Sequence, residues 1–375
     1  MHIAFGRLIA RLFIALLVSG AVMLLSASEP GAQSSSAPPL KKIRYATGSP
    51  VINVAYPWMT LPIVLGYWKQ EGYDVEIVGL QGGTAAVQQA VAGNVQILQA
   101  NSGTLVQANV TANTRFRAIM LNTVNDWSVV ALEDGPIHDF KDFKGKSIGV
   151  PTLATGGVPL LKEYLQQSGL TPDDDVKIVA VGFGAQAFEA LVSNRVQGLM
   201  FFQAQIAGFE NLGGKFRYFH GDDWRTQPDF TMATLQKTVD SDPDMLVAIV
   251  RGSAKATLFA MTNPDCARRL HWARWPDTKP SGSTDEATLA KWDLHNLEAQ
   301  EASMKEAFAL SGGKLWGLYT APEIGDLQHW MLQAKLIDHE LPPASYIVDI
   351  PNFFEKVNDF DHAAVIQQAE KCVVD

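Results

Sequence analysis

The chain has 375 residues, of which 47% are hydrophobic and 18% charged, and its formal net charge is −9 at pH 7. This length exceeds one typical hydrophobic core, so we expect two lobes. The negative charge argues against nucleic-acid binding, because a phosphate backbone needs a basic surface. The two cysteines, Cys266 and Cys372, are too few for a disulfide framework or a thiolate metal site, and the sequence leaves open whether they pair.

The N-terminus has the parts of a secretory signal peptide. Arg7 and Arg11 precede an uncharged apolar run over residues 12–25, and small residues follow. The alternative is a transmembrane anchor, which needs about 20 apolar residues. We predict a signal peptide over residues 1–28 and a flexible leader, rich in Ser, Ala, Pro and Gly, over residues 29–40. The protein would then be periplasmic, and we expect no further apolar segment long enough to span a membrane.

The first predicted elements after the leader are a strand, a helix and a second strand. The strand covers residues 41–46 and ends in a polar turn at residues 47–50. Residues 53–66 read as a loop that runs into a helix, in which Pro62 fits only the first turn. Residues 73–78 form the next strand.

The stretch from residue 79 to residue 104 is expected to form one wall of a binding pocket. Its pattern is strand end, Gly-rich turn, helix, strand, polar turn and helix start, and Gly93 with Asn94 ends the first helix. In an open α/β sheet such turns lie at the carboxyl ends of strands, where ligands bind. Helix N-termini at these turns offer unpaired N–H groups and a partial positive charge.

A similar alternation continues further along the chain. We predict strands at 147–150, 176–181 and 196–202, with helices at 159–168 and 185–192 between them. A long helical pattern follows the last of these elements and reaches the C-terminal part of the chain.

We expect the chain to cross between the lobes twice. The first crossing falls within residues 123–132 and the return within residues 220–234. Lobe one would therefore consist of residues 41–125 plus 227–375, and lobe two of residues 126–226.

Four segments carry a resemblance to a known family by their order and spacing. They read WKQEGYDVEIV at 68–78, VAGNVQILQANSGT at 91–104, FKDFKGKSIGVP at 140–151 and FEALVSNRVQGL at 188–199. Together they resemble the periplasmic solute-binding proteins of ABC importers, in the group for nitrate, sulfonates, taurine and thiamine-pyrimidine precursors. Asn94 and Gln96 depart from the acidic residues that this family commonly has there.

The resemblance implies an α/β fold of the type II periplasmic binding proteins. Each of the two lobes would be a mixed sheet flanked by helices, with a helical C-terminal extension. The solute would bind in the interlobe cleft by hinge closure, and the closed form would deliver it to an ABC permease at the cytoplasmic membrane. No Arg or Lys cluster points at the cleft turns, so we expect a small carboxylate, sulfonate or heterocycle. We expect a monomer that uses no cofactor or metal and is not an enzyme.

Two other functions remain open. An enzyme on the same fold, related to thiamine-pyrimidine synthesis, would need a cofactor-dependent activity or a bound metal. An exported ligand sensor would dock on a signalling receptor in place of a permease.

The candidate ligand-binding residues are donors in the turns and nearby aromatic side chains. The first lobe would contribute Thr47, Ser49, Gly83, Thr84, Ser102 and Thr104. The second lobe would contribute Thr152, Thr155 and Gly156 at the position of the family's Gly-Ser-Thr turn, together with Phe202 and Gln203. We expect Trp58 and Trp127 to sandwich a planar or apolar solute. A Ser or Thr at a helix start can instead serve as an N-cap alone.

Overall fold

Two mixed five-stranded sheets organise the part of the chain that the computed structural model describes, residues 39–310 and 312–373. The predicted signal peptide and residues 29–38 of the predicted leader lie outside the described residues. The expectation of an α/β fold with two lobes, each built on a mixed sheet flanked by helices, is confirmed.

The first sheet has the strand order β2-β1-β3-β10-β4. Its strands are β1 (Lys41–Thr47), β2 (Tyr73–Gly79), β3 (Ile97–Asn101), β4 (Phe116–Leu121) and β10 (Phe230–Leu235). β1 pairs in parallel with β2 and β3, whereas β10 runs antiparallel to β3 and β4. Successive side chains point to opposite faces, so Tyr45 joins one core cluster and Ala46 another.

Helices cover both faces of this first sheet. The cluster around Tyr45 includes side chains of α1 (Pro57–Val64) and α9 (Pro243–Thr262), and the cluster around Ala46 includes side chains of α3 (Gly83–Val91) and α4 (Ser102–Ala112). The short helix α2 (Tyr67–Gln70) precedes β2.

The second sheet has the strand order β7-β6-β8-β5-β9. Its strands are β5 (Trp127–Leu132), β6 (Lys146–Val150), β7 (Val176–Ala180), β8 (Gly198–Phe202) and β9 (Phe216–Phe219). β6 pairs in parallel with β7 and β8, and β5 runs antiparallel to β8 and β9. Side chains of α5 (Gly157–Gln167) pack in one core cluster of this sheet, and those of α6 (Ala185–Val192) and α7 (Gln203–Asn211) pack in the other. A 3-10 helix, η1 (Phe140–Phe143), precedes β6.

The chain crosses between the two sheets after β4 and again before β10. The two crossing segments bond to each other: the backbone N–H of Asn125 donates to Gln227 O at 2.8 Å, and that of Asp229 donates to Thr123 O at 2.9 Å. A 3-10 helix, η2 (Trp224–Thr226), precedes the return crossing. The division into residues 41–125 plus 227–375 and residues 126–226 remains a proposal.

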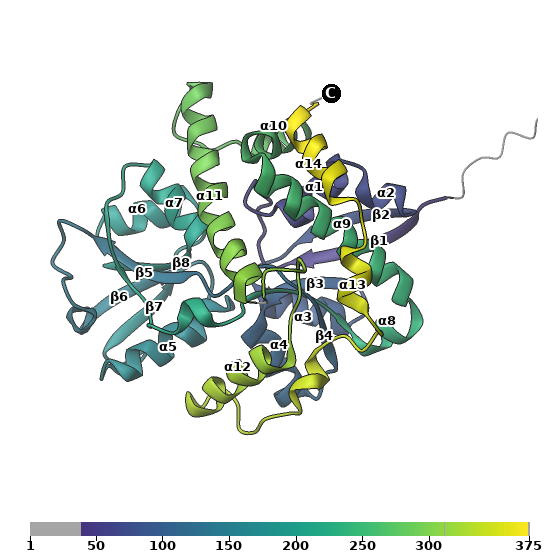
Figure 1. Cartoon of the computed structure of the whole chain (residues 1–375). Helices are drawn as coiled ribbons and strands as arrows, with labels where there is room; N and C mark the ends of the chain where they lie inside the picture. The colour runs from purple at the N-terminus through teal and green to yellow at the C-terminus, as the bar shows by residue number, and fades with distance from the viewer. Residues whose placement is uncertain (1–38, 311, 374–375) are drawn as a thin grey trace, which may run out of the picture. The chain divides into compact units, whose positions relative to one another are not determined.

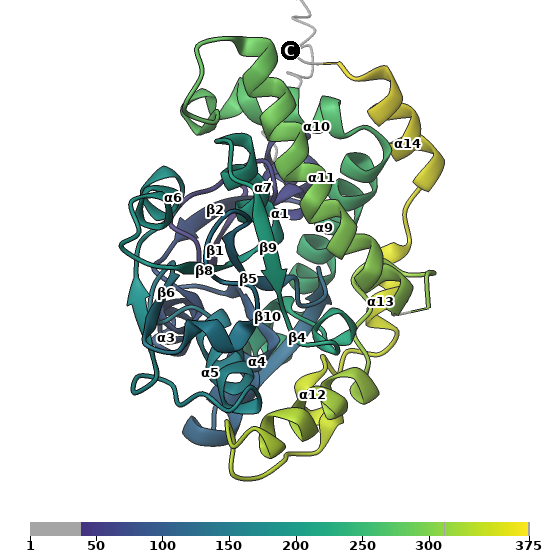
Figure 2. The same ribbon diagram turned by 90° about the vertical axis from the view of Figure 1, so that its left-hand side faces the viewer.

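The C-terminal part of the chain is helical. It contains α8 (Gln236–Ser241), α10 (Pro264–Arg274), η3 (Pro276–Thr278), α11 (Glu286–Leu310), α12 (Ala321–Gln333), η4 (Pro343–Tyr346), α13 (Phe353–Asn358) and α14 (His362–Lys371). The long α11 contacts α7 of the second lobe and also α10 (Figure 1). α12 lies against α4 of the first lobe (Figure 2).

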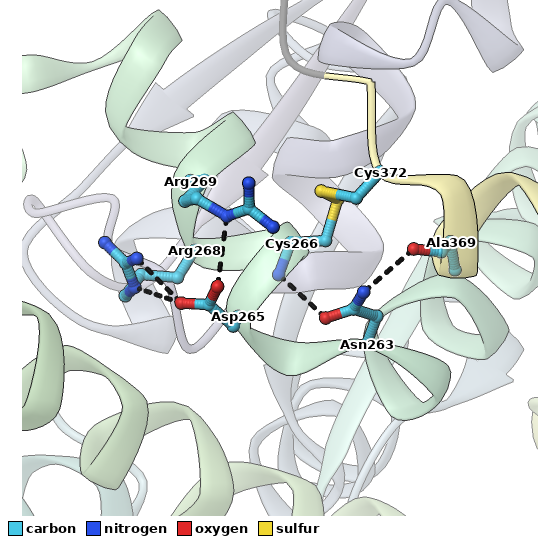
Figure 3. The surroundings of a disulfide bond; sticks show 7 residues. All are labelled: Asn263, Asp265, Cys266, Arg268, Arg269, Ala369 and Cys372. Atoms are coloured by element: carbon cyan, nitrogen blue, oxygen red, sulfur yellow. Dashed lines mark hydrogen bonds and ion pairs between the residues drawn. A yellow bond between two sulfur atoms is a disulfide. The ribbon is translucent and has the colours of Figure 1, made fainter.

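A disulfide joins Cys266 to Cys372 and settles the question that the sequence left open. Beside it, the Asn263 side chain accepts a hydrogen bond from the backbone N–H of Cys266 at 3.0 Å and donates to Ala369 O at 2.9 Å (Figure 3). The end of the chain is thereby attached to α10.

Two expectations about helices were wrong. Pro62 lies inside α1, beyond its first turn, because the helix already starts at Pro57, where a missing N–H costs nothing. The 20-residue α9, with a mean hydropathy of 1.3 over an 18-residue window, is long and apolar enough to cross a membrane, and 72% of that window is buried inside the protein. A buried core helix passes the same test of length and composition, so this is weak evidence for a membrane span.

Candidate functional site

Turns from the two lobes touch at the carboxyl ends of their strands. A Cβ atom added to Gly156 would lie 2.0 Å from Asn101 Oδ1, and one added to Gly82 would lie 2.8 Å from Ala154 O. We call the contact formed by Gly82, Asn101, Ala154 and Gly156 the seam. Glycine is needed on each side of the seam because the backbone of one lobe approaches the other more closely than a side chain allows.

Two strands of the first lobe carry buried polar atoms without partners. Gln99 is fully buried, and its Oε1 accepts hydrogen bonds from Trp58 Nε1 at 2.6 Å and from the Tyr45 hydroxyl at 3.1 Å. These two donors identify that atom as the oxygen, so the amide nitrogen is a donor, and it has no partner among the described residues. Thr47 pairs with Gln99 in the sheet register. Its hydroxyl is also buried and has no hydrogen-bond partner among the described residues.

The second lobe adds one more such atom. The hydroxyl of Thr152, in the turn after β6, is buried and has no hydrogen-bond partner in the described part of the chain. The turn itself is closed by the backbone N–H of Thr155, which donates to Thr152 O at 3.3 Å. That Thr47, Thr152 and Thr155 contact a solute remains a prediction.

A buried carboxylate, Asp229, joins the return crossing to both lobes. It accepts hydrogen bonds from Asn101 Nδ2, at 2.8 Å to each oxygen, and from Trp127 Nε1 at 3.1 Å. Burial nevertheless dominates and raises the pKa of Asp229 to about 8. The Asp229 side chain thus joins the return crossing to β3 of the first lobe and to β5 of the second.

Ser102 belongs to the same network, and its hydroxyl has no hydrogen-bonding capacity left for a ligand. Its hydroxyl donates to Asp229 O at 2.8 Å, lies 2.7 Å from Thr231 Oγ1 and accepts from the Tyr319 hydroxyl at 3.1 Å. Its side chain therefore holds the start of α4 against β10, a structural role that the sequence analysis allowed for such residues.

A second buried carboxylate, Asp126, lies on the first crossing. It is 1% exposed, and no side chain of the described residues donates a hydrogen bond to its oxygens; the backbone N–H groups of Gln203 and of Asp126 itself stabilise the charged form only weakly. Burial raises the pKa of Asp126 to about 6, against the opposing effect of the Arg225 charge. Sequence reasoning missed both carboxylates, although each stands beside an aromatic residue of a crossing, Trp127 or Phe230, and that could have been a signal.

Two hollows are lined by residues of both lobes. The wide cleft, about 370 Å³, lies between the loop after β1, the starts of α6 and α7, and α11; among the predicted residues, Ser49 and Phe202 line it. The hinge cavity, about 30 Å³, lies between the crossings, the starts of α4 and α5, and α12; Thr104 and Gly156 line it.

Sequence reasoning also missed several residues that line these hollows. In the wide cleft they are Asn53, Gln205 and Asn296, and in the hinge cavity Asn125, Gln227 and Trp330. Asn296 and Trp330 come from the C-terminal helices, in which the sequence analysis named no candidate site residue. Local sequence holds no sign that α11 and α12 reach the interlobe region.

The two tryptophans proposed to sandwich a solute are both buried. Trp58 is fully buried in α1, and Trp127, at the start of β5, is 2% exposed and packs edge-on against Phe202 with ring centroids 5.6 Å apart. Each donates its indole N–H to a protein side chain, Gln99 or Asp229. The sandwich remains a prediction.

The remaining predicted residues lie at helix starts. Gly83 begins α3 and is buried, Thr84 beside it is exposed, and Gln203 begins α7 and donates to Ser128 Oγ at 3.3 Å. Within the described residues, no group of three or more His, Cys, Asp or Glu side chains could hold a metal ion.

Comparison with solved structures identifies the fold. The periplasmic aliphatic sulphonate binding protein SsuA from Escherichia coli superposes with a TM-score of 0.59 at 13% identity, over 82% of this chain and 91% of that one. The alkanesulfonate-binding protein SsuA from Xanthomonas axonopodis pv. citri, bound to MOPS, gives 0.57 at 14% identity, over 83% and 99%. The periplasmic nitrate-binding protein NrtA from Synechocystis gives 0.54 at 10% identity, over 90% of each chain. The fold is that of the periplasmic solute-binding proteins of ABC importers, as the resemblance in sequence implied.

Comparison by sequence gives the family. A search of curated proteins found no match. A family model described as "NMT1/THI5 like" matches residues 61–267, which is more than half of the chain. The chain therefore belongs to the NMT1/THI5-like family.

Proposed function

We propose that this protein is the extracytoplasmic solute-binding component of an ABC importer. It captures a small organic solute between its lobes and delivers it to a membrane permease. The observation that carries the proposal is that strand ends and turns of both lobes hold buried polar atoms without partners: Thr47 Oγ1 and Gln99 Nε2 in the first lobe and Thr152 Oγ1 in the second. Leaving one such atom unsatisfied costs about 1–3 kcal/mol, so several of them in the two lobes support a role for a ligand or ordered water.

Hinge closure suits the way in which the two lobes are built. Apart from Ala55, the buried members of each hydrophobic cluster come from one lobe, so most of the packing of each lobe can persist while the lobes move. The crossing segments around Asn125 and Gln227 bond to each other and would bend together. Closing would bring Thr152 over the donors of the first lobe and exclude water from the solute.

The proposed solute is a small carboxylate, sulfonate or heterocycle. The similar structures named above are a sulfonate-binding and a nitrate-binding protein, which supports an acceptor-rich ligand without identifying it. The unpartnered atoms of Thr47, Gln99 and Thr152 belong to neutral groups. Lys279, on the wall of the wide cleft, has its ammonium bonded to Glu286 at 2.6 Å. We therefore propose hydrogen bonding by neutral donors as the main source of affinity.

Native mass spectrometry of the mature protein, purified after export, tests this function. We expect one small organic molecule per chain, and removing it and adding it back should change the radius of gyration measured by X-ray scattering as the lobes close. If the protein carries no solute and none of a panel of carboxylates, sulfonates and heterocycles raises its melting temperature, the proposal fails. A bound metal or redox cofactor would instead favour the enzyme, and specific docking on a signalling receptor would favour the sensor.

A further inference from the structure

The hinge cavity has one polar wall and one apolar wall. The side chains of Asn101, Asn125, Gln227 and Asp229 form the polar wall, and each of these residues is more than nine-tenths buried. Leu160 of α5 and Trp330 of α12 belong to the apolar wall. The side chains of Asn101 and Asp229 form hydrogen bonds with each other. The amides of Asn125 and Gln227 therefore determine which groups the cavity can bind.

These two amides present one free donor and one free acceptor. Asn125 Oδ1 accepts from the backbone N–H of Trp127 at 3.2 Å, so its other atom is the amide nitrogen. Gln227 Nε2 donates to Asp223 Oδ2 at 3.4 Å, so its other atom is the oxygen. Asn125 Nδ2 and Gln227 Oε1 are buried and have no partner among the residues that the structure describes. The two residues are neighbours across the crossings, joined by a backbone hydrogen bond.

The size of the cavity limits the group that it can receive. About 30 Å³ is room for roughly two water-sized groups, which a carbonyl oxygen and an adjacent N–H would fill. A larger molecule would extend into the outer groove, about 580 Å³, which lies between α5 and α12 and shares Trp330 and Leu336 with the hinge cavity. In that groove, Glu163 Oε2 is buried and lacks a partner within the described residues.

Trp330 is placed to cover such a group. It is partly buried and packs against the core clusters of both lobes. Its indole therefore forms part of the apolar wall of the hinge cavity in this structure and limits the access of water to the donor and the acceptor.

We propose that the hinge cavity binds an amide, lactam or cyclic urea group of the solute. Asn125 donates to the carbonyl oxygen, Gln227 accepts from the adjacent N–H, and the rest of the molecule lies in the outer groove. This inference rests on the proposed function and narrows its solute class to heterocycles or amides. A carboxylate or a sulfonate has no N–H, so it would leave the Gln227 oxygen buried and unpaired, which is how a hydrogen-bonding site rejects an analogue.

Probes that share a body and differ in the head group test this selection. Benzamide, benzoate and benzenesulfonate form one set, and δ-valerolactam with cyclohexanone forms another; binding to the solute-free mature protein is measured by calorimetry. We expect the amide and the lactam to bind at least about 10-fold more tightly than the other members of their sets. Equal or tighter binding of benzoate or benzenesulfonate would overturn the inference and leave the proposed function standing. Failure of every probe, together with the absence of any co-purified solute, would count against both.

A pair of matched variants tests the position of the site. Gln227→Met removes the acceptor at nearly constant volume, and Gln205→Met makes the same change in the wide cleft. We expect the first to weaken amide and lactam binding by about 10-fold or more and the second to leave it unchanged. The reverse result would place the solute in the wide cleft and overturn the inference. Asn125→Asp, which keeps an oxygen for the Trp127 N–H but removes the donor, should weaken the same probes, and unchanged melting temperatures would separate these effects from misfolding.

Discussion

Gly156 should be essential for closing the lobes around a solute. The Cβ atom of a Gly156→Ala variant would lie 2.0 Å from Oδ1 and 2.2 Å from Cγ of Asn101. Ordinary contact needs about 3.5 Å, so the lobes must part by more than about 1 Å or Asn101 must move. Asn101 cannot move freely, because both oxygens of the Asp229 carboxylate accept hydrogen bonds from its Nδ2 at 2.8 Å.

The cost of this substitution follows from those hydrogen bonds. Burial raises the pKa of Asp229 to about 8, so the carboxyl is mostly neutral at pH 7. Losing one hydrogen bond between neutral groups costs about 0.5–1.5 kcal/mol, which lowers the equilibrium constant for closure by about 2- to 10-fold. A solute that needs the closed form should lose affinity by the same factor. The cores of the two lobes are untouched, so the melting temperature of the solute-free variant should stay close to that of the wild type.

Calorimetry with the co-purified solute, together with X-ray scattering with and without it, measures both effects. Gly208→Ala is the matched control, because its Cβ would lie 3.3 Å from Nε2 of the flexible Gln205 side chain, outside the hinge cavity. If Gly156→Ala bound the solute as tightly as the control and closed to the same radius of gyration, the seam would not be part of the closed state and the reasoning would fail.

Three further predictions concern stability. Replacing Cys266 and Cys372 by Ser should lower the free energy of unfolding by about 2–4 kcal/mol, because the disulfide closes a loop between residues 106 positions apart; thermal unfolding with and without reductant checks this. Burial raises the pKa of Asp229 in the folded protein to about 8, whereas an Asp in the unfolded chain has a pKa of about 4. Between these values only the folded protein keeps the proton, so the free energy of unfolding should fall as pH rises from about 4 to about 8. Asp229→Asn should flatten that dependence in denaturant titrations, and an unchanged slope would contradict it. Trp58→Phe should cost about 1 kcal/mol or more in urea unfolding, because it removes the indole donor to Gln99; no loss would mean that this bond does not hold the amide.

The sequence alone determined the local elements and the class of fold. The helix predicted at 185–192 has those bounds in the structure, and the strand predicted at 41–46 is one residue longer. Such elements follow from the spacing of apolar residues and from glycine caps such as Gly93, which has φ 79° as a left-handed cap requires. Their order along the chain was enough to indicate two α/β lobes and the family.

Tertiary structure decided which polar atoms at the interlobe site are left free. Ser102 and Thr47 both follow or end a strand, yet the Ser102 hydroxyl is fully used by residues more than 100 positions away, whereas the Thr47 hydroxyl is not. The Cys266–Cys372 pair and the neighbouring amides of Asn125 and Gln227 likewise depend on long-range contacts. A hydrogen bond across the fold is made by chain segments that only packing brings together, so no local pattern could show which donors and acceptors remain for a solute.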